Sequence, residues 1–177
     1  MACSLTTGRK VPCKSAVGGI KTIYFADYGT LGNPQITAGE ITELSGSPEW
    51  FQFDVKGAST LETAINSSRE NGTTFYESTL TMALTFQDKA TQEELKLIAH
   101  ARPHVAIEDY NGNYFVVGLE HGAEVTGGTI STGAAMGDLS GYNLTIVAQE
   151  TAPPYFTTAS VITSDASTTQ IDPTPAD

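Results

Sequence analysis

The chain has 177 residues, of which 40% are hydrophobic and 16% charged, and these proportions predict one globular domain with a buried core. Glycine, threonine and serine are abundant, which favours strands and turns over long helices and predicts a mainly β protein. The net charge of −11 argues against sequence-specific binding of nucleic acid, because a negative surface repels phosphates.

The basic residues gather near the N-terminus. Arg9, Lys10, Lys14 and Lys21 precede the first acidic residue, Asp27, and neither Lys nor Arg occurs after position 102. A basic arm on an acidic body can dock on a neighbouring copy of the same chain. It can equally be a solvated, disordered N-terminus, and the residues leave both interpretations open.

Residues 1–20 lack the continuous apolar run of a signal peptide, and no later stretch approaches the roughly 20 apolar residues of a spanning helix. We therefore expect a protein without an integral membrane segment, made and kept on the cytoplasmic side. Cys3 and Cys13 are the two cysteines, and their spacing matches no zinc or redox motif. We interpret them as free thiols and leave a disulfide open.

The first half of the chain predicts an arm followed by strands. An arm over residues 1–21 leads into a strand through "KTIYFAD", in which Ile23 and Phe25 share a face. "EWFQFDVKG" alternates between apolar and polar positions, as a half-buried strand does. "STLETAINSSRE" is ambiguous, because it also fits a helical face, but the Asn71-Gly72 pair that follows is typical of a two-residue hairpin and favours a strand.

One long strand and one helix follow that turn. In "YESTLTMALTF", Tyr76 and the alternating apolar residues up to Phe86 line one face, which predicts an antiparallel strand. A helix is expected at about 91–101, because Thr91 and Glu94 form a capping box and Pro103 ends the apolar helical spacing.

The second half predicts another hairpin, a loop, a strand and a tail. The hairpin turns at Asn111-Gly112, and its return strand, "YFVVGL", is apolar on both faces and needs cover on both sides. The glycine-rich segment 125–141 is expected to be a long loop before the strand "YNLTIVAQE". We therefore expect a single β domain over 22–155, followed by a Thr- and Pro-rich tail over 156–177.

Three histidines lie close together in the sequence, but they do not predict a metal site. His100 and His104 have the spacing of helical zinc ligands, yet Pro103 ends the helix between them, and His121 follows the second hairpin. Glu108 and Asp109 point to opposite faces of their strand, which is poor geometry for acid–base catalysis.

The remaining motifs do not indicate an enzyme either. "GAAMGDLSG" has no following helix or basic residue to bind phosphate, and Asp138 alone cannot bind calcium. The sequence contains no nucleophile elbow, Walker loop or dinucleotide fingerprint. The sequence therefore predicts a structural protein without metal or cofactor.

Residues 71–150 resemble the tail tube (major tail) proteins of tailed bacteriophages. The resemblance rests on the Asn-Gly hairpin before a long alternating strand, on the short helix, and on "NGNYFVVG", "EHGAEVTGG" and "GAAMGDLSGYNLTIVAQE". The opening "GRKVPCKSAVGGIKTIYFADYG" also fits the N-terminal arm of such virion proteins, so the likeness covers about two-thirds of the chain.

This resemblance implies an antiparallel β-barrel or sandwich with one short flanking helix, an extended arm and a C-terminal tail. It also implies a virion protein, assembled in the host cytoplasm, whose rings, commonly hexameric, stack head to tail into a tube. The implied partners are other copies, other tail proteins, and DNA that passes without specific binding.

The sequence suggests a set of subunit-interface candidates but identifies no lumen-facing residue. The candidates are Arg9, Lys10, Lys14, Lys21, Gly127, Gly128, Met136 and Asp138. The alternatives are another virion component, namely a tail terminator, neck or capsid decoration protein, and a ligand-binding or adhesion β-sandwich.

Overall fold

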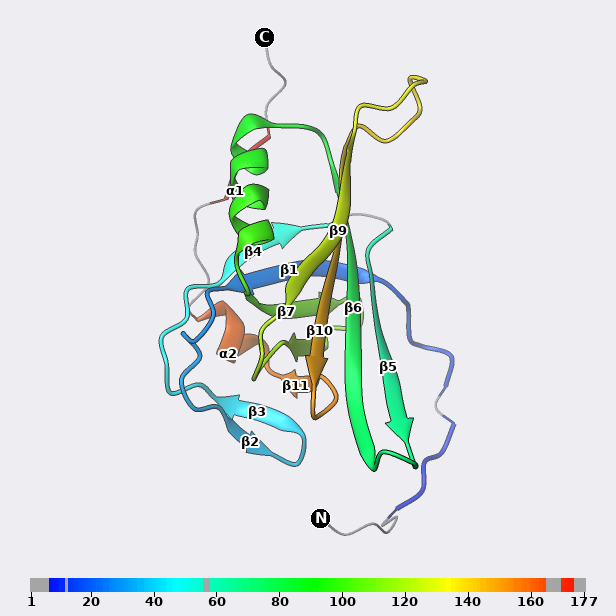
Figure 1. The fold of residues 1–177 in the computed structure, drawn as a ribbon, viewed down its shortest axis with the longest axis vertical. Helices are drawn as coiled ribbons and strands as arrows, with labels where there is room; N and C mark the ends of the chain where they lie inside the picture. The colour runs from blue at the N-terminus through cyan, green and yellow to red at the C-terminus, as the bar shows by residue number, and fades with distance from the viewer. Residues whose placement is uncertain (1–6, 12, 56–57, 165–169, 174–177) are drawn as a thin grey trace.

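The computed structural model describes residues 7–11, 13–55, 58–164 and 170–173, and within these ranges eleven strands and two helices form two packed sheets (Figure 1). The chain is mainly β, as predicted. Of the two predicted architectures, the described residues form the sandwich of open sheets and not a closed barrel. The strands of one sheet run across those of the other (Figure 1), an arrangement typical of orthogonal sheet packing.

The large sheet has seven strands among the described residues, in the order β2-β3-β11-β8-β7-β1-β4. Only β11 and β3 pair in parallel; the other neighbours are antiparallel. The bounds are β1 Ile20–Ala26, β2 Gln35–Thr37, β3 Glu40–Glu43, β4 Phe51–Asp54, β7 His104–Asp109, β8 Tyr114–Val117 and β11 Tyr155–Thr157.

The central strands of the large sheet are covered on both faces. In β1, Ile23 and Phe25 share a face, as predicted, and pack in the core between the two sheets. Tyr24 and Ala26 are equally buried on the opposite face, in a second cluster that includes Trp50. The return strand β8 is buried on both sides too, which confirms the prediction from its apolar sequence.

The small sheet has four antiparallel strands in the order β5-β6-β10-β9. The bounds are β5 Thr60–Ser68, β6 Thr73–Thr85, β9 Glu124–Ser131 and β10 Gly141–Glu150. "STLETAINSSRE" is therefore a strand, as predicted. The turn that follows is longer than predicted: residues 69–72 connect Ser68 to its partner Thr73, so Asn71-Gly72 belongs to a four-residue loop.

Only one face of the small sheet packs on the large sheet. We call this the inner face; it carries Leu80 and Met82 of β6, opposite Ile146 and Leu144 of β10. This confirms the predicted apolar face of the long strand up to Leu84; Phe86, also predicted on it, lies beyond the end of β6 with a φ of +77° and is 40% exposed. The opposite face, which we call the outer face, carries the threonines and glutamates that alternate with these residues.

Helix α1, Lys89–His100, lies beside β9 (Figure 1). The predicted capping box at Thr91 is wrong, because Asp88 is the N-cap and its Oδ2 accepts from the backbone N–H of Ala90 and Thr91 at 3.0 and 3.1 Å. The capping-box pattern was ambiguous because Asp88 is also a favourable N-cap, and Thr91 instead faces the core. No helix among the described residues is long and apolar enough to cross a bilayer.

Two predicted irregular segments contain regular structure. The first half of the predicted loop 125–141 is strand β9, so the loop itself spans only 132–140. The predicted tail begins with β11, which lies between β3 and β8, and continues into α2, Ala159–Thr163, whose Ile162 is completely buried. The tail prediction is therefore wrong up to residue 163, and its residues 165–169 and 174–177 lie outside the described ranges.

Candidate assembly surfaces

The small sheet ends in two strands, β5 and β9, each of which is paired on one side only within the described part of the chain. They are nine and eight residues long. The unpaired backbone groups of such an edge can bind a strand of another chain. Since the two strands between these edges, β6 and β10, are antiparallel to their neighbours, β5 and β9 run in opposite directions, and a rotated copy could place its β5 antiparallel beside β9.

Each of these edges exposes a large hydrophobic side chain on the inner face. Ile65 of β5 is 68% exposed, and Ile130 of β9 is 62% exposed. Ile65 pairs with Tyr76, and Ile130 pairs with Tyr142. Both tyrosines lie on the inner face, so the two isoleucines lie there as well. Each edge thus has apolar surface that one copy of the chain leaves uncovered.

An apolar groove of about 580 Å³ runs between α1 and β9. Leu95 and Ala99 of the helix face Val125 and Ile130 of the edge strand across it. A strand added to β9 would lay its inner-face side chains along this groove. The glycine candidates Gly127 and Gly128 lie in β9 at the same edge.

The outer face of the small sheet is mostly polar, and its own strands carry no positive charge. Strands β5, β6, β9 and β10 contain no Lys or Arg, whereas Glu62 and Glu77 both project from this face. Gln149 donates from Nε2 to Oε2 of Glu77 at 2.6 Å. The outer face of β6 also carries Thr73, Thr79, Thr81 and Thr85 together with Phe75 and Ala83. The sequence did not identify a shared face for these carboxylates, although they lie on the consecutive strands β5 and β6, because their common face depends on the register of this hairpin.

The loop 132–140 projects from the end of β9 and β10 away from the sheets (Figure 1). Met136 at its tip is fully exposed. Asp138 instead organises the loop: its Oδ2 accepts from the N–H groups of Ala134 and Ala135 at 2.9 and 2.8 Å, and these bonds lower the pKa of its carboxyl. Of these two interface candidates, Met136 is therefore available to a partner and Asp138 supports the loop.

The N-terminal arm carries the basic candidates Arg9, Lys10 and Lys14, and residues 7–11 and 13–19 are all exposed. Cys13 is exposed on the same arm, and Cys3 lies outside the described residues. Lys21 differs from the other basic candidates, because its Nζ contacts Oε1 of Glu108 at 2.7 Å within the chain, and this bond raises the lysine's pKa. We therefore regard Lys21 as an internal partner of Glu108.

The arm is attached to the body at the second hairpin. The Asn111 side chain accepts from Val17 N–H through Oδ1 at 2.9 Å and donates from Nδ2 to the Val17 carbonyl at 2.7 Å. Asp109 supports this turn: burial alone would raise the pKa of its carboxyl, but hydrogen bonds from Asn113 and Asn111 outweigh burial and lower it. The predicted hairpin at Asn111-Gly112 thus also holds the base of the arm.

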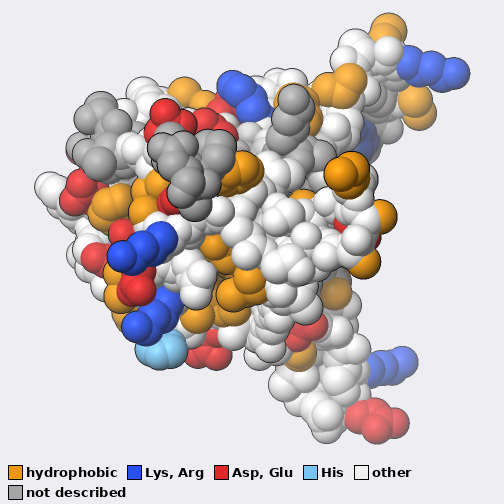
Figure 2. All heavy atoms as spheres, turned by 90° about the horizontal axis from the view of Figure 1, so that it is seen from above, with side chains coloured by type: hydrophobic (Ala, Val, Ile, Leu, Met, Phe, Trp, Pro, Cys, Tyr) orange, Lys and Arg blue, Asp and Glu red, His pale blue; other side chains and the backbone are white. Residues whose placement is uncertain are grey.

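The surface includes further hydrophobic side chains. Figure 2 shows hydrophobic groups in patches between charged side chains on the face seen from above. Leu97 of α1 is 62% exposed and Phe156 of β11 is 51% exposed. Phe156 packs against Phe115, with ring centroids 4.8 Å apart. These patches are smaller and more scattered than the edge strands of the small sheet, so they are weaker candidates for an interface.

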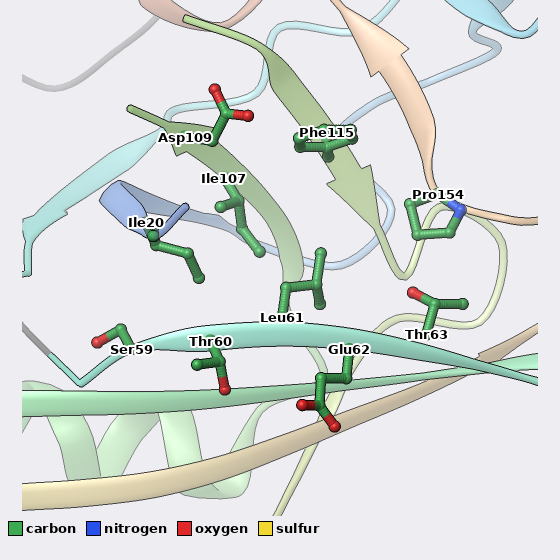
Figure 3. Close-up of a pocket in the computed structure, with 11 residues that line it drawn as sticks. Ile20, Ser59, Thr60, Leu61, Glu62, Thr63, Ile107, Asp109, Phe115 and Pro154 are labelled. Atoms are coloured by element: carbon green, nitrogen blue, oxygen red, sulfur yellow. The ribbon is translucent and has the colours of Figure 1, made fainter. Parts of the chain in front are cut away.

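A second groove, of about 530 Å³, opens between the two sheets beside β5 (Figure 3). Ile20, Ile107 and Phe115 of the large sheet face Leu61 of β5 across it. Its acidic groups are not arranged for catalysis, because Asp109 is bound within its own turn and Glu62 projects from the outer face. This groove offers mainly apolar contact.

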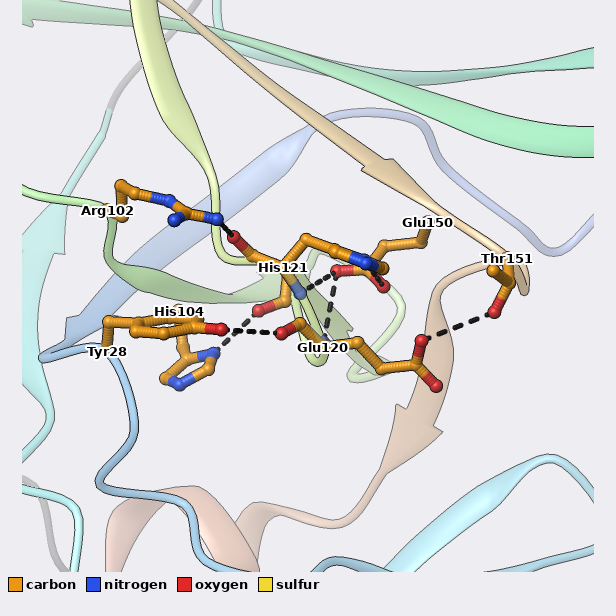
Figure 4. Close-up of polar contacts among 8 residues, drawn as sticks. Tyr28, Arg102, His104, Glu120, His121, Glu150 and Thr151 are labelled. Atoms are coloured by element: carbon orange, nitrogen blue, oxygen red, sulfur yellow. Dashed lines mark hydrogen bonds and ion pairs between the residues drawn. The ribbon is translucent and has the colours of Figure 1, made fainter.

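The structure separates the three histidines. His100 is exposed at the end of α1, whereas His104 begins β7 and is buried. His104 Nε2 accepts from the N–H of Gly29 at 2.9 Å and its Nδ1 lies 2.6 Å from the Gly118 carbonyl, so both ring nitrogens are used by a neutral ring (Figure 4). Burial lowers its pKa. This is a structural histidine, stacked on Tyr28.

His121 lies in a cluster with Glu120 and Glu150, in which three ligand-type atoms come within 4.8 Å of one another (Figure 4). Glu150 Oε1 accepts from the N–H groups of Glu120 and His121 at 3.1 and 3.0 Å, and its Oε2 lies 3.3 Å from His121 Nδ1. The cluster therefore ties the turn after β8 to the end of β10. Gly118 and Gly122 permit that turn with φ values of +71° and +75°.

No protein-family model, no curated protein and no solved structure matches this chain. Among the described residues, the candidate surfaces for assembly are the two edges and the outer face of the small sheet, together with the loop and arm. Sequence reasoning placed Gly127, Gly128 and Met136 near them. It missed Ile65 and Ile130, whose alternation within their strands resembles that of core residues.

Proposed function

We propose that this chain is a structural subunit that assembles into rings, and that stacked rings form the tail tube of a tailed bacteriophage. The observation that carries the proposal is the pair of open, oppositely directed edges on the small sheet. Repeated pairing of β5 with β9 of the next copy would join the small sheets around a ring. The resemblance of residues 71–150 to tail tube proteins supports the identity of that ring.

The proposal assigns the outer face of the small sheet to the lumen. Its strands carry glutamates and threonines without any Lys or Arg. A surface of this charge repels the DNA backbone, so DNA can pass without binding. The large sheet would then form the wall outside it, and the apolar residues of its central strands β1 and β7 are already covered within one copy.

Stacking requires a second pair of complementary surfaces. The exposed loop 132–140 and the basic arm are the segments that extend farthest from the sheets (Figure 1). The acidic surplus of the body complements Arg9, Lys10 and Lys14 of a neighbouring arm. We therefore assign contacts between copies to both segments.

The direct test is negative-stain electron microscopy over a range of protein concentrations, with the particle mass measured by light scattering. Stacked rings with a central hole are the expected result. Rings that do not stack would favour a terminator, neck or other ring-forming virion component. Monomers at every concentration, even after addition of preformed tail tips, would contradict the proposal.

A matched set of variants tests the edge contact. Ile65→Lys and Ile130→Lys each place a charge at one open edge, where the side chain is exposed in the single copy. We expect both to prevent ring formation while circular dichroism and urea unfolding of the monomer stay unchanged. Leu97→Lys, on an equally exposed residue of α1, is the control and should assemble normally. Normal rings from both edge variants would exclude this interface.

The arm is tested by the double variant Lys10→Glu, Lys14→Glu. If the arm binds an acidic neighbour, this charge reversal should weaken tube formation, and added salt should weaken the wild-type tube in the same direction. Arg69→Glu together with Lys89→Glu, at exposed positions outside the groove between α1 and β9, serves as a control of equal charge change. Unaltered tubes from the arm variant would refute the electrostatic contact.

A further inference from the structure

Two asparagines of this chain precede glycine, and the structure places them in different environments. Asn71-Gly72 lies in the loop between β5 and β6, and Asn111-Gly112 lies in the loop between β7 and β8. Both loops are exposed, and both glycines have positive φ, +63° and +79°. In local sequence and backbone conformation the two sites are therefore similar.

The two sites differ in the hydrogen bonds that hold the asparagine side chain and the N–H of the following glycine. The Asn111 side chain forms three hydrogen bonds, two with the Val17 backbone and one with Asp109 Oδ2 at 3.2 Å. The N–H of Gly112 donates to the Asp109 carbonyl at 3.2 Å. At the other site, neither the Asn71 side chain nor the Gly72 N–H forms such a bond to another described residue; only the Asn71 N–H does, to Ser68 Oγ.

We propose that Asn71-Gly72 is a site of spontaneous deamidation and that docking of the N-terminal arm protects Asn111-Gly112 from the same reaction. In the reaction, the Gly72 backbone nitrogen loses its proton to a base and attacks Cγ of Asn71. A C–N bond forms, the side-chain nitrogen leaves as ammonia, and a five-membered imide results. Water then opens the imide at either carbonyl, so that one water is consumed and aspartate or isoaspartate is produced.

Glycine favours this reaction because it has no side chain to obstruct the approach of its nitrogen. The other asparagines lack one of these conditions: Asn33 precedes proline, which has no N–H, and Asn66 and Asn143 lie inside strands. Asn113 precedes the bulky Tyr114, and its side chain donates to Asp109 Oδ2 at 2.9 Å. At Asn111, deamidation would also replace the donor that binds the Val17 carbonyl by a carboxylate oxygen. The inference does not depend on the proposed function.

The experiment incubates the full-length protein at 37 °C and slightly alkaline pH and follows both peptides by mass spectrometry, with an isoaspartate assay. We expect the mass gain of amide-to-carboxylate exchange at Asn71, at least severalfold faster than at Asn111. In urea, which removes the structure, the two rates should become similar. Equal rates in the folded protein, or no reaction at Asn71 while the urea sample reacts, would overturn the proposal.

Variants test the role of the arm. Val17→Pro removes the N–H that donates to Asn111 Oδ1 and should accelerate reaction at Asn111 while the rate at Asn71 stays the same. Ala16→Pro, at the neighbouring exposed position, is the matched control and should leave both rates unchanged. An Asn111 rate that does not respond to Val17→Pro would show that the arm does not protect it. Asn71→Gln should abolish the mass gain in its own peptide.

Discussion

The two sheets of this protein bury their residues differently. The central strands of the large sheet are covered on both faces, so adjacent residues of one strand, such as Ile23 and Tyr24, both belong to a core. The small sheet is covered only on its inner face, so Met82 is buried while its neighbour Thr81 lies on the partly exposed outer face. The large sheet therefore stabilises the chain, and the small sheet retains a face and two edges for contacts with other molecules.

The largest effect should come from removing β11, an interior strand of the large sheet. A chain that ends at Pro154 lacks β11 and α2, so β3 and β8 lose the strand between them and Ile162 leaves its cluster. We expect this chain to lose cooperative urea unfolding, whereas a chain that ends at Ser164 should unfold like the wild type. If the shorter chain unfolds cooperatively with the wild-type midpoint, β11 is dispensable for stability. That result would contradict the conclusion that the large sheet stabilises the chain.

Single substitutions should show the contrast between the sheets. Ile23→Ala and Tyr24→Ala should each lower the free energy of unfolding by about 3 kcal/mol, because both side chains are buried. In β6, Met82→Ala should cost about 3 kcal/mol and Thr81→Ala about 0.5 kcal/mol or less. Urea denaturation of the monomer measures all four values. Equal losses at positions 81 and 82 would mean that the outer face is also a core face.

The buried histidine of the large sheet predicts a pH dependence. Because the pKa of folded His104 lies below the ordinary 6.5, the unfolded chain binds the proton first, and the free energy of unfolding should fall as the pH falls below about 6.5. His104→Gln should lose this contribution to the pH dependence and destabilise the protein at neutral pH by about 2 kcal/mol, since it disturbs two buried hydrogen bonds. His100→Gln is the exposed control. A pH profile identical to wild type in His104→Gln would contradict the assignment.

The smallest effect on stability is expected at the loop of the small sheet. Asp138→Ala removes the acceptor for the N–H groups of Ala134 and Ala135 but touches no core residue. We expect an unchanged urea midpoint and faster proteolysis within residues 132–140. In wild-type protein, assembly should protect the same loop. Equal cleavage before and after assembly would argue against a contact between copies there.

The elements that could be predicted are those whose signal is local. The long strand β6, the end of α1 before Pro103 and the hairpin at Asn111-Gly112 all follow from alternation, helical spacing or turn chemistry within a few residues. The turn after β5 shows the limit of this reasoning, because an Asn-Gly pair fits more than one loop length. The helix start shows the same limit, since Asp88 and Thr91 are both acceptable caps.

The segments that could not be predicted depend on distant partners. "YFT" becomes β11 because β3 and β8 flank it, and Thr157 donates to the carbonyl of Ile41, 116 positions away. "EVTGGTIS" becomes β9 because β10 pairs with it, although its two glycines favour a loop. In both cases pairing in the sheet overrides weak local preference.

The sequence by itself determined a mainly β chain, the alternation of apolar and polar residues along its clearest strands, and the concentration of basic residues in the arm. Only the tertiary structure decided which strands lie at the edges, which carboxylates share the outer face, and that His104 is buried while His121 binds Glu150. The reason is physical. Periodicity and turn chemistry act between residues a few positions apart, whereas strand order and burial arise from contacts between segments that the chain brings together only on folding.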